Sequence, residues 1–153
     1  MKEECPGGAP SLADEPSVHH SSFIVPHSLE ALESIHRRKT GALILVSLQL
    51  GAMVAGAGAG QRAALETYGR RLGLAFQITD DLLDVRGDQA ATGKRVGKDA
   101  GSGKLTFPGL LGVDRSIRRA EELIAEAVQA VAPLGPRAGS LEALARYVLE
   151  RNH

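Results

Sequence analysis

The sequence has no excess of charge of either sign, few aromatic side chains and a single cysteine. Its 18 basic and 18 acidic residues cancel, which leaves no electrostatic footprint for nucleic acid or for an anionic membrane. Aromatic residues make up 3% of the chain and Trp is absent, which argues against a surface that stacks bases. Cys5 alone cannot form an internal disulfide, so a reducing, cytoplasmic setting is expected.

Residues 1–27 differ in composition from the rest of the chain. They are rich in Pro, Gly, Ser and acidic residues and show no apolar periodicity, which predicts a flexible tail. The first residues lack the basic, apolar and small-residue zones of a secretory signal, so no export is expected. Residues 28–153 are expected to form the folded part, since the chain is 43% hydrophobic and long enough for one core.

From Ser28 onward the apolar residues recur at helical spacing almost throughout. Ser28 is a suitable N-cap for a first helix, and no alternating strand pattern occurs, so the predicted fold class is an all-α helical bundle. The expected segments are a helix from residue 28, a buried helix over 41–60, a long helix over 61–85, a loop over 86–107, and two final helices that follow Asp114 and Ser140.

The segment 41–60 contains no charged residue, and its length alone would permit a membrane span. Its five glycines, together with Ser47 and Gln49, lower its hydrophobicity, and glycines allow helices to pack closely. We therefore expect a buried helix in a protein interior and no membrane span.

Three carboxylates interrupt the apolar end of the long helix. At about 100° per residue, Asp80, Asp81 and Asp84 fall within an arc of about 100°, and Gln77 lies in the same arc. Because apolar residues occupy the rest of the circumference, the carboxylates are expected to line an internal cavity. Buried like charges require cations, and oxygen ligands without His or Cys favour Mg²⁺. The alternative is an N-capping or surface acidic cluster.

A loop rich in Gly and Lys follows the acidic helix and includes Lys94 and Lys104. Glycines let a loop approach a ligand closely, and lysines are compact charges suited to phosphate. The loop is not a Walker A sequence, since Leu105 follows Lys104 and no strand precedes it. Such a loop is usually a solvated turn. Its place soon after residues 77–84, which we call the acidic run, nevertheless favours phosphate binding.

In combination, these segments resemble the C-terminal half of the trans-isoprenyl diphosphate synthases, the family of farnesyl and geranylgeranyl diphosphate synthases. The run from Gln77 to Asp84 is similar to the family's second aspartate-rich motif, DDxxD. Residues 36–41 resemble its Lys-Thr helix, residues 93–108 its diphosphate-closing loop, and residues 147–152 the end of bacterial short-chain members. The resemblance covers residues 28–153 and implies the C-terminal half of the isoprenoid synthase fold.

The resemblance implies Mg²⁺-dependent head-to-tail condensation of two substrates, an allylic diphosphate and isopentenyl diphosphate. In this half of the site, Asp80 would be the main Mg²⁺ ligand, and Asp81 and Asp84 would support it directly or through bound water.

The same resemblance implies roles for side chains outside the acidic run. Lys39, Lys94 and Lys104 would contact the allylic diphosphate. Thr40 and Gln77 would place neutral oxygens near the developing positive charge, where a carboxylate would trap it.

The family's first aspartate-rich motif has no counterpart in this sequence. The Asp residues outside the run from Gln77 to Asp84 each stand alone: Asp14, Asp88, Asp99 and Asp114. A cluster of cations would therefore have protein ligands on one of its two sides only. We therefore expect a truncated enzyme that forms a homodimer or binds a complementing half. The alternative is a non-catalytic helical subunit that pairs with a full-length synthase.

Overall fold

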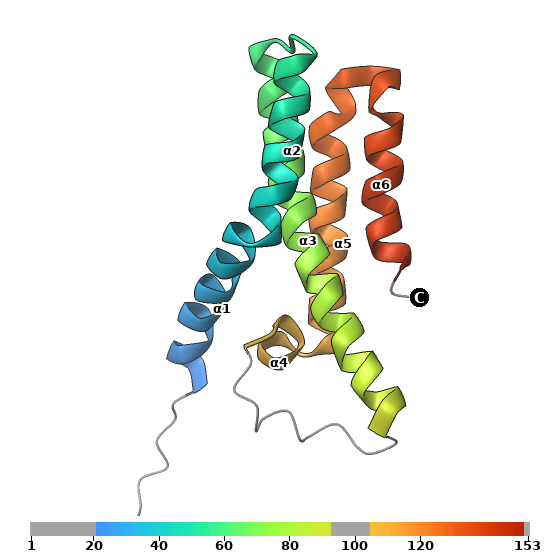
Figure 1. The fold of residues 1–153 in the computed structure, drawn as a ribbon. Coiled ribbons are helices and arrows are strands. Elements are labelled where there is room, and N and C mark those ends of the chain that lie inside the picture. Colours follow the sequence, from blue (N-terminus) through green and yellow to red (C-terminus); the bar gives the residue numbers. More distant parts are fainter. Residues whose placement is uncertain (1–20, 93–104, 152–153) are drawn as a thin grey trace, which may run out of the picture.

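The computed structural model describes residues 21–92 and 105–151, and every regular element in these two ranges is helical. The predicted all-α class is therefore confirmed. In chain order (Figure 1) the elements are α1 (Ser21–Arg38), α2 (Thr40–Val54), α3 (Ala59–Thr92), α4 (Phe107–Leu111), α5 (Val113–Val131), the 3₁₀ segment η2 (Ala132–Ala138) and α6 (Gly139–Glu150).

The long helix α3 lies at the centre of the bundle. It packs against α2 on one side and α5 on another, and α6 packs against α5. These helices run side by side, whereas α1 leaves the bundle at an angle and the short α4 lies beside the lower part of α3 (Figure 1). The acidic run is thus placed on the central element, within reach of α1, α4 and the end of α6.

The main core lies between α3 and α5, whose apolar residues recur at helical spacing and face each other. The side chains of these two helices that belong to the core are 0–4% exposed: Tyr68, Leu72, Leu74, Ala75, Ile78 and Leu82 from α3, and Ala120, Leu123, Ile124, Ala127 and Val131 from α5. Because so many apolar side chains of α3 are buried, this helix is held in one orientation. The direction in which each of its carboxylates leaves the helix is therefore fixed as well.

A close contact between two glycines joins α2 to α3. A Cβ added to Gly73 would lie 2.9 Å from the Cα of Gly41, which is closer than packed atoms allow. The segment 41–60 thus packs closely at Gly41, but the prediction that it forms a buried helix is wrong for one side of α2, where Leu43 and Leu50 are 68% and 56% exposed. It is not one helix, however, because α2 ends at Val54 and Gly56 takes a left-handed φ of 63° in the turn before α3. Within the described residues, no helix is long and apolar enough to cross a membrane.

Several helix boundaries differ from the sequence prediction. Helix α1 begins at Ser21, before the N-cap expected at Ser28, and α3 continues to Thr92, into the segment expected to be a loop. The short α4 also lies where a loop was expected, and Thr106 caps it by accepting a hydrogen bond from the N–H of Gly109 at 3.2 Å. The tail expected over residues 1–27 falls largely outside the described residues and stays a prediction.

Candidate active site

Gln77 and the three carboxylates of the acidic run face two different environments. Gln77 and Asp81 are buried, at 5% and 6% exposure, whereas Asp80 and Asp84 are exposed. The expectation that all three carboxylates line an internal cavity is therefore wrong for Asp80 and Asp84. The described helices cover the side of α3 that carries Asp81, and they leave the neighbouring side, which carries the other two, open to solvent.

Asp81 links α3 to the start of α4. Its Oδ2 accepts a hydrogen bond from the backbone N–H of Phe107 at 3.0 Å. The same oxygen lies 3.5 Å from Nε2 of His36, at the end of α1. A carboxylate that accepts hydrogen bonds inside the protein is held in one orientation. Asp81 thus ties together three helices that are distant in the sequence.

His36 is a buried residue of this site that the sequence did not single out. Its Nδ1 lies 3.2 Å from Oε1 of Gln77, and its ring stacks on Phe107 with centroids 5.6 Å apart and planes inclined by 16°. A lone His on a helix carries no periodic signal. The sequence offered one hint, because His36 is the first residue of the segment 36–41 that resembles the family's Lys-Thr helix.

Lys39 and Thr40 lie at the break between α1 and α2. Lys39 is exposed, has φ −85° and ψ −111°, and donates its backbone N–H to the carbonyl of Ile35 at 3.0 Å. Thr40 is half-buried and begins α2. The contact of His36 with Gln77 brings this corner to the same region of α3 as the acidic run. Lys94 and Lys104 lie outside the described residues.

Arg151, just after α6, is a second residue to which the sequence analysis gave no role, although it lies in the segment 147–152 that resembles the family. Its guanidinium lies 4.0 Å from the ring centroid of Phe76 and donates hydrogen bonds to the Phe76 carbonyl at 3.2 Å and to Oγ1 of Thr79 at 3.0 Å. It also lies 3.8 Å from Oδ1 of Asp80. The guanidinium of Arg151 thus joins the end of α6 to the exposed carboxylate of Asp80.

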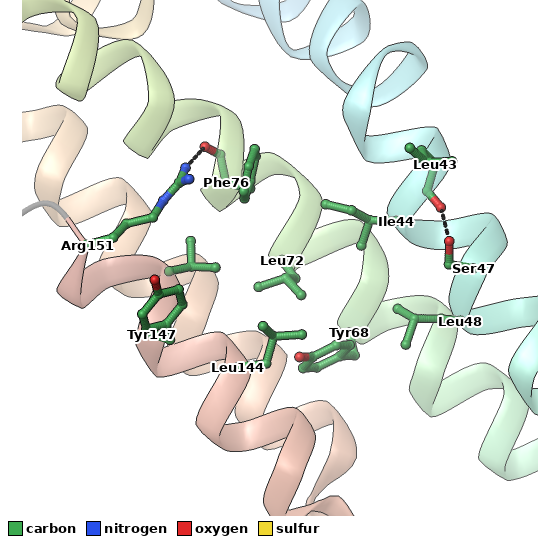
Figure 2. A pocket seen from close by; sticks show the side chains of 11 residues that line it. Leu43, Ile44, Ser47, Leu48, Tyr68, Leu72, Phe76, Leu144, Tyr147 and Arg151 are labelled. Atoms are coloured by element: carbon green, nitrogen blue, oxygen red, sulfur yellow. Dashed lines mark hydrogen bonds between the residues drawn. The ribbon is translucent and has the colours of Figure 1, made fainter.

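An apolar pocket of about 500 Å³ opens between α2, α3 and α6. Figure 2 shows Leu72 and Tyr68 of α3 facing Leu144 of α6, with Arg151 and Phe76 at one end of the pocket. Asp80 lies near this end, because Arg151 approaches its Oδ1. Tyr68 donates its hydroxyl to the carbonyl of Leu141 at 2.7 Å, and burial raises the pKa of Tyr68 to about 12. The pocket is therefore an apolar surface next to the acidic run.

Comparison with known proteins places this arrangement in a family. Residues 13–134 match the sequence model of the polyprenyl synthetase family. Farnesyl diphosphate synthase of Escherichia coli is 48% identical over 129 residues, which cover 81% of this chain and 43% of the E. coli protein. The chain belongs to the polyprenyl synthetase family, and it spans less than half the length of this relative.

Solved structures agree with the fold. The apo structure of an FPP/GFPP synthase from Zymomonas mobilis superposes with a TM-score of 0.65 at 33% identity, over 78% of this chain and 38% of that one. A geranyltransferase from Helicobacter pylori, complexed with magnesium and isoprenyl diphosphate, superposes with a TM-score of 0.59 at 32% identity, over 80% and 40%. Because the relatives are synthases and transferases, the comparisons do not favour the alternative of a non-catalytic subunit.

Proposed function

We propose that this chain forms one wall of the active site of a prenyltransferase that condenses an allylic diphosphate with isopentenyl diphosphate head to tail. In this reaction the allylic diphosphate ionises, the double bond of isopentenyl diphosphate attacks the carbocation, and a proton is lost. The observation that carries the proposal is the exposed pair Asp80 and Asp84, one helical turn apart on α3, in a chain of this family.

The donor atoms present fit magnesium. Mg²⁺ at a phosphate site commonly takes one or two protein carboxylates and completes its octahedron with water and phosphate oxygens. Asp80 and Asp84 offer such oxygens on an open side of α3, and the H. pylori relative was solved with magnesium. Among the described residues, no three His, Cys, Asp or Glu side chains lie close enough to hold a metal by themselves. When bound, Mg²⁺ would neutralise the charge of the departing pyrophosphate.

Asp81 differs from its two neighbours in this scheme. One of its oxygens already accepts the N–H of Phe107, and only 6% of the residue is exposed. We therefore assign direct Mg²⁺ binding to Asp80 and Asp84, and assign Asp81 a supporting role in which it fixes the α3 to α4 junction.

The other residues proposed for the reaction act on the diphosphate and on the carbocation. Lys39, together with Lys94 and Lys104, would bind the diphosphate through point charges. Thr40 and Gln77 would face the developing cation with neutral oxygens, which stabilise positive charge without forming a bond to it. The corner that carries Lys39 and Thr40 meets α3 through the contact of His36 with Gln77, which supports placing these groups in one site.

The exposed face of α2 supports a complementing half as the partner. Leu43, Val46, Leu50 and Met53 recur on one face of α2, at 68%, 47%, 56% and 65% exposure. We call these four residues the α2 stripe. Exposed apolar rows of this kind mark interaction surfaces. A second copy of the chain carries the same motifs and would not supply a first aspartate-rich motif, so we propose that the N-terminal half of the fold, in a longer or separate chain, covers the stripe.

Calorimetric titration of Mg²⁺ with and without pyrophosphate tests the proposed site. Ions that share ligands with the diphosphate must bind more tightly when it is present, and the coupling is reciprocal. We expect pyrophosphate to increase Mg²⁺ affinity by about tenfold or more, and Asp80→Asn to abolish the increase. Glu66→Gln is the matched control, since Glu66 is exposed on the same helix and pairs with Arg70. Equal Mg²⁺ affinity with and without pyrophosphate would contradict the proposal.

A cytoplasmic location stays a prediction, supported by the single cysteine of the sequence.

A further inference from the structure

The guanidinium of Arg151 is held against α3 by three contacts. It lies over the ring of Phe76, 4.0 Å from the centroid, and Nη2 donates to the Phe76 carbonyl at 3.2 Å (Figure 2). Nη2 also donates to Oγ1 of Thr79 at 3.0 Å. Thr79 is fully buried, and its hydroxyl donates to the same Phe76 carbonyl at 2.8 Å. A ring face and two hydrogen bonds therefore fix the position of this positive charge.

The fixed guanidinium lies beside a proposed Mg²⁺ ligand. Nη2 of Arg151 is 3.8 Å from Oδ1 of Asp80, which is longer than a hydrogen bond. The side chain of Asp80 is 54% exposed, so its oxygens remain accessible from solvent. The charge of Arg151 therefore acts on any ion that binds Asp80, while the carboxylate itself stays open to that ion.

Two kinds of ligand would meet this charge differently. Mg²⁺ alone is a cation, and the guanidinium repels it. A complex of Mg²⁺ with pyrophosphate keeps a net negative charge, which the same guanidinium attracts, and phosphate oxygens accept hydrogen bonds from arginine. The charge of Arg151 thus opposes binding of the bare ion and favours the ion that arrives together with a diphosphate.

We propose that Arg151 makes Mg²⁺ binding at Asp80 depend on a diphosphate, because it weakens binding of the bare ion and strengthens binding of the complex of Mg²⁺ with the diphosphate. The inference rests on the proposed function, in which Asp80 binds Mg²⁺ beside the pyrophosphate group. A site with this selectivity fills with metal when substrate is present and stays largely empty without it. The residue just after α6 thereby contributes to a site whose carboxylates lie on α3.

Arg151→Met tests the proposal in the purified chain, by calorimetric titration of Mg²⁺ alone and with pyrophosphate. Met retains an apolar contact with the ring of Phe76 and removes the charge beside Asp80. We expect the affinity for Mg²⁺ alone to rise about threefold at low ionic strength, and the increase caused by pyrophosphate to become about fivefold smaller. An affinity for Mg²⁺ alone that stays the same or falls would overturn the inference.

Arg151→Lys separates the charge from the packing of α6 on α3. Lys keeps a positive charge near Asp80 but lacks the planar fork that bonds Phe76 and Thr79. We expect both Mg²⁺ affinities of this variant to stay within about twofold of the unmodified chain, even where the free energy of unfolding falls. Equal shifts in the Lys and Met variants would show that Arg151 acts through packing alone, which would refute the selectivity role.

Two further variants complete the experiment. Arg146→Met is the matched control, because it removes the same charge from α6 at a residue that pairs with Glu142, and we expect no change in either Mg²⁺ affinity. In an Asp80→Asn background, Arg151→Met should no longer change the affinity for Mg²⁺ alone. Equal Mg²⁺ affinity with and without pyrophosphate in the unmodified chain would contradict the proposed function, whereas coupling that Arg151→Met leaves unchanged would overturn this inference alone.

Discussion

Helices α5 and α2 are both rich in apolar residues, yet the chain encloses one and exposes the other. In α5, charged and apolar residues alternate with the helical period, and the apolar face is buried against α3: Ala120, Leu123, Ile124, Ala127 and Val131. In α2 no residue is charged, but the α2 stripe remains exposed on the side away from α3. Helix α5 has one apolar face and needs one layer of neighbours to bury it. Helix α2 is apolar all round, so burying it would need a layer of neighbours on each side.

The difference shows which part of the fold the chain completes by itself. The α3 and α5 interface is closed, and it holds the acidic run in a fixed direction. The second layer of α2 is not among the described elements, and the E. coli relative is more than twice as long as the segment that matches it. We therefore propose that the exposed stripe, and the exposed Asp80 and Asp84, both face parts of the family fold that lie outside the matched segment.

Shortening an apolar side chain should give the largest difference in stability loss between α5 and α2. Leu123→Ala on α5 removes a fully buried side chain, and we expect the free energy of unfolding to fall by about 2–5 kcal/mol. Leu50→Ala on α2 makes the same chemical change at 56% exposure and should cost about 0.5 kcal/mol or less. Urea titrations of both variants provide the measurement. Equal losses would mean that α2 is as enclosed as α5.

Titration at alkaline pH tests the burial of Tyr68, which lines the apolar pocket. The pKa of Tyr68 is raised by burial to about 12, from about 10 in an unfolded chain. Because the folded state holds the phenol proton more tightly, this contribution to stability is fully present below pH 10 and is lost as pH rises toward 12, by roughly 2 kcal/mol in total.

Comparison with Tyr68→Phe isolates this contribution from other groups that titrate at high pH. At pH 8 the variant should be less stable by about 1 kcal/mol, since it lacks the hydrogen bond to Leu141. Because Tyr68 ionisation removes roughly 2 kcal/mol, which is more than this deficit, the difference should vanish and change sign between pH 10 and pH 12, as chemical denaturation would show. A constant difference across that range would contradict a buried, proton-retaining Tyr68.

Charge placed on the α2 stripe should have the smallest effect on stability and a clear effect on association. Leu50→Lys and Val46→Lys change exposed positions, so we expect the free energy of unfolding to change by about 0.5 kcal/mol or less. Self-association of the purified chain, measured by sedimentation velocity, should decrease because a charge interrupts the apolar row. Gln129→Lys, at an exposed position of α5, is the matched control. Unchanged association in the stripe variants would exclude the stripe as the contact surface.

The sequence predicted the all-α bundle and the main helices because local periodicity carries both. The three carboxylates were correctly placed on the apolar α3. The exposure of Asp80 and Asp84 was missed, because an apolar circumference indicates burial in the complete fold and does not show which layers this chain contains.

The parts of the site that the sequence did not predict depend on contacts between distant segments. His36 meets Gln77 across 41 residues, and Arg151 meets Thr79 across 72. Neither contact has a local pattern, because a single polar residue on a helix becomes a site residue only when another helix packs beside it. Lys39 and Thr40 were singled out by resemblance, and the structure places them at the corner next to His36.

Complementation tests the central claim, that the chain forms one wall of a two-walled site. Prenyl transfer from dimethylallyl diphosphate to isopentenyl diphosphate would be measured with the purified chain alone, with the N-terminal half of a related synthase alone, and with the two mixed. The account predicts background turnover for each part and measurable turnover for the mixture, which Asp80→Asn abolishes and Glu66→Gln retains. Robust turnover by the chain alone, as a monomer, would contradict it.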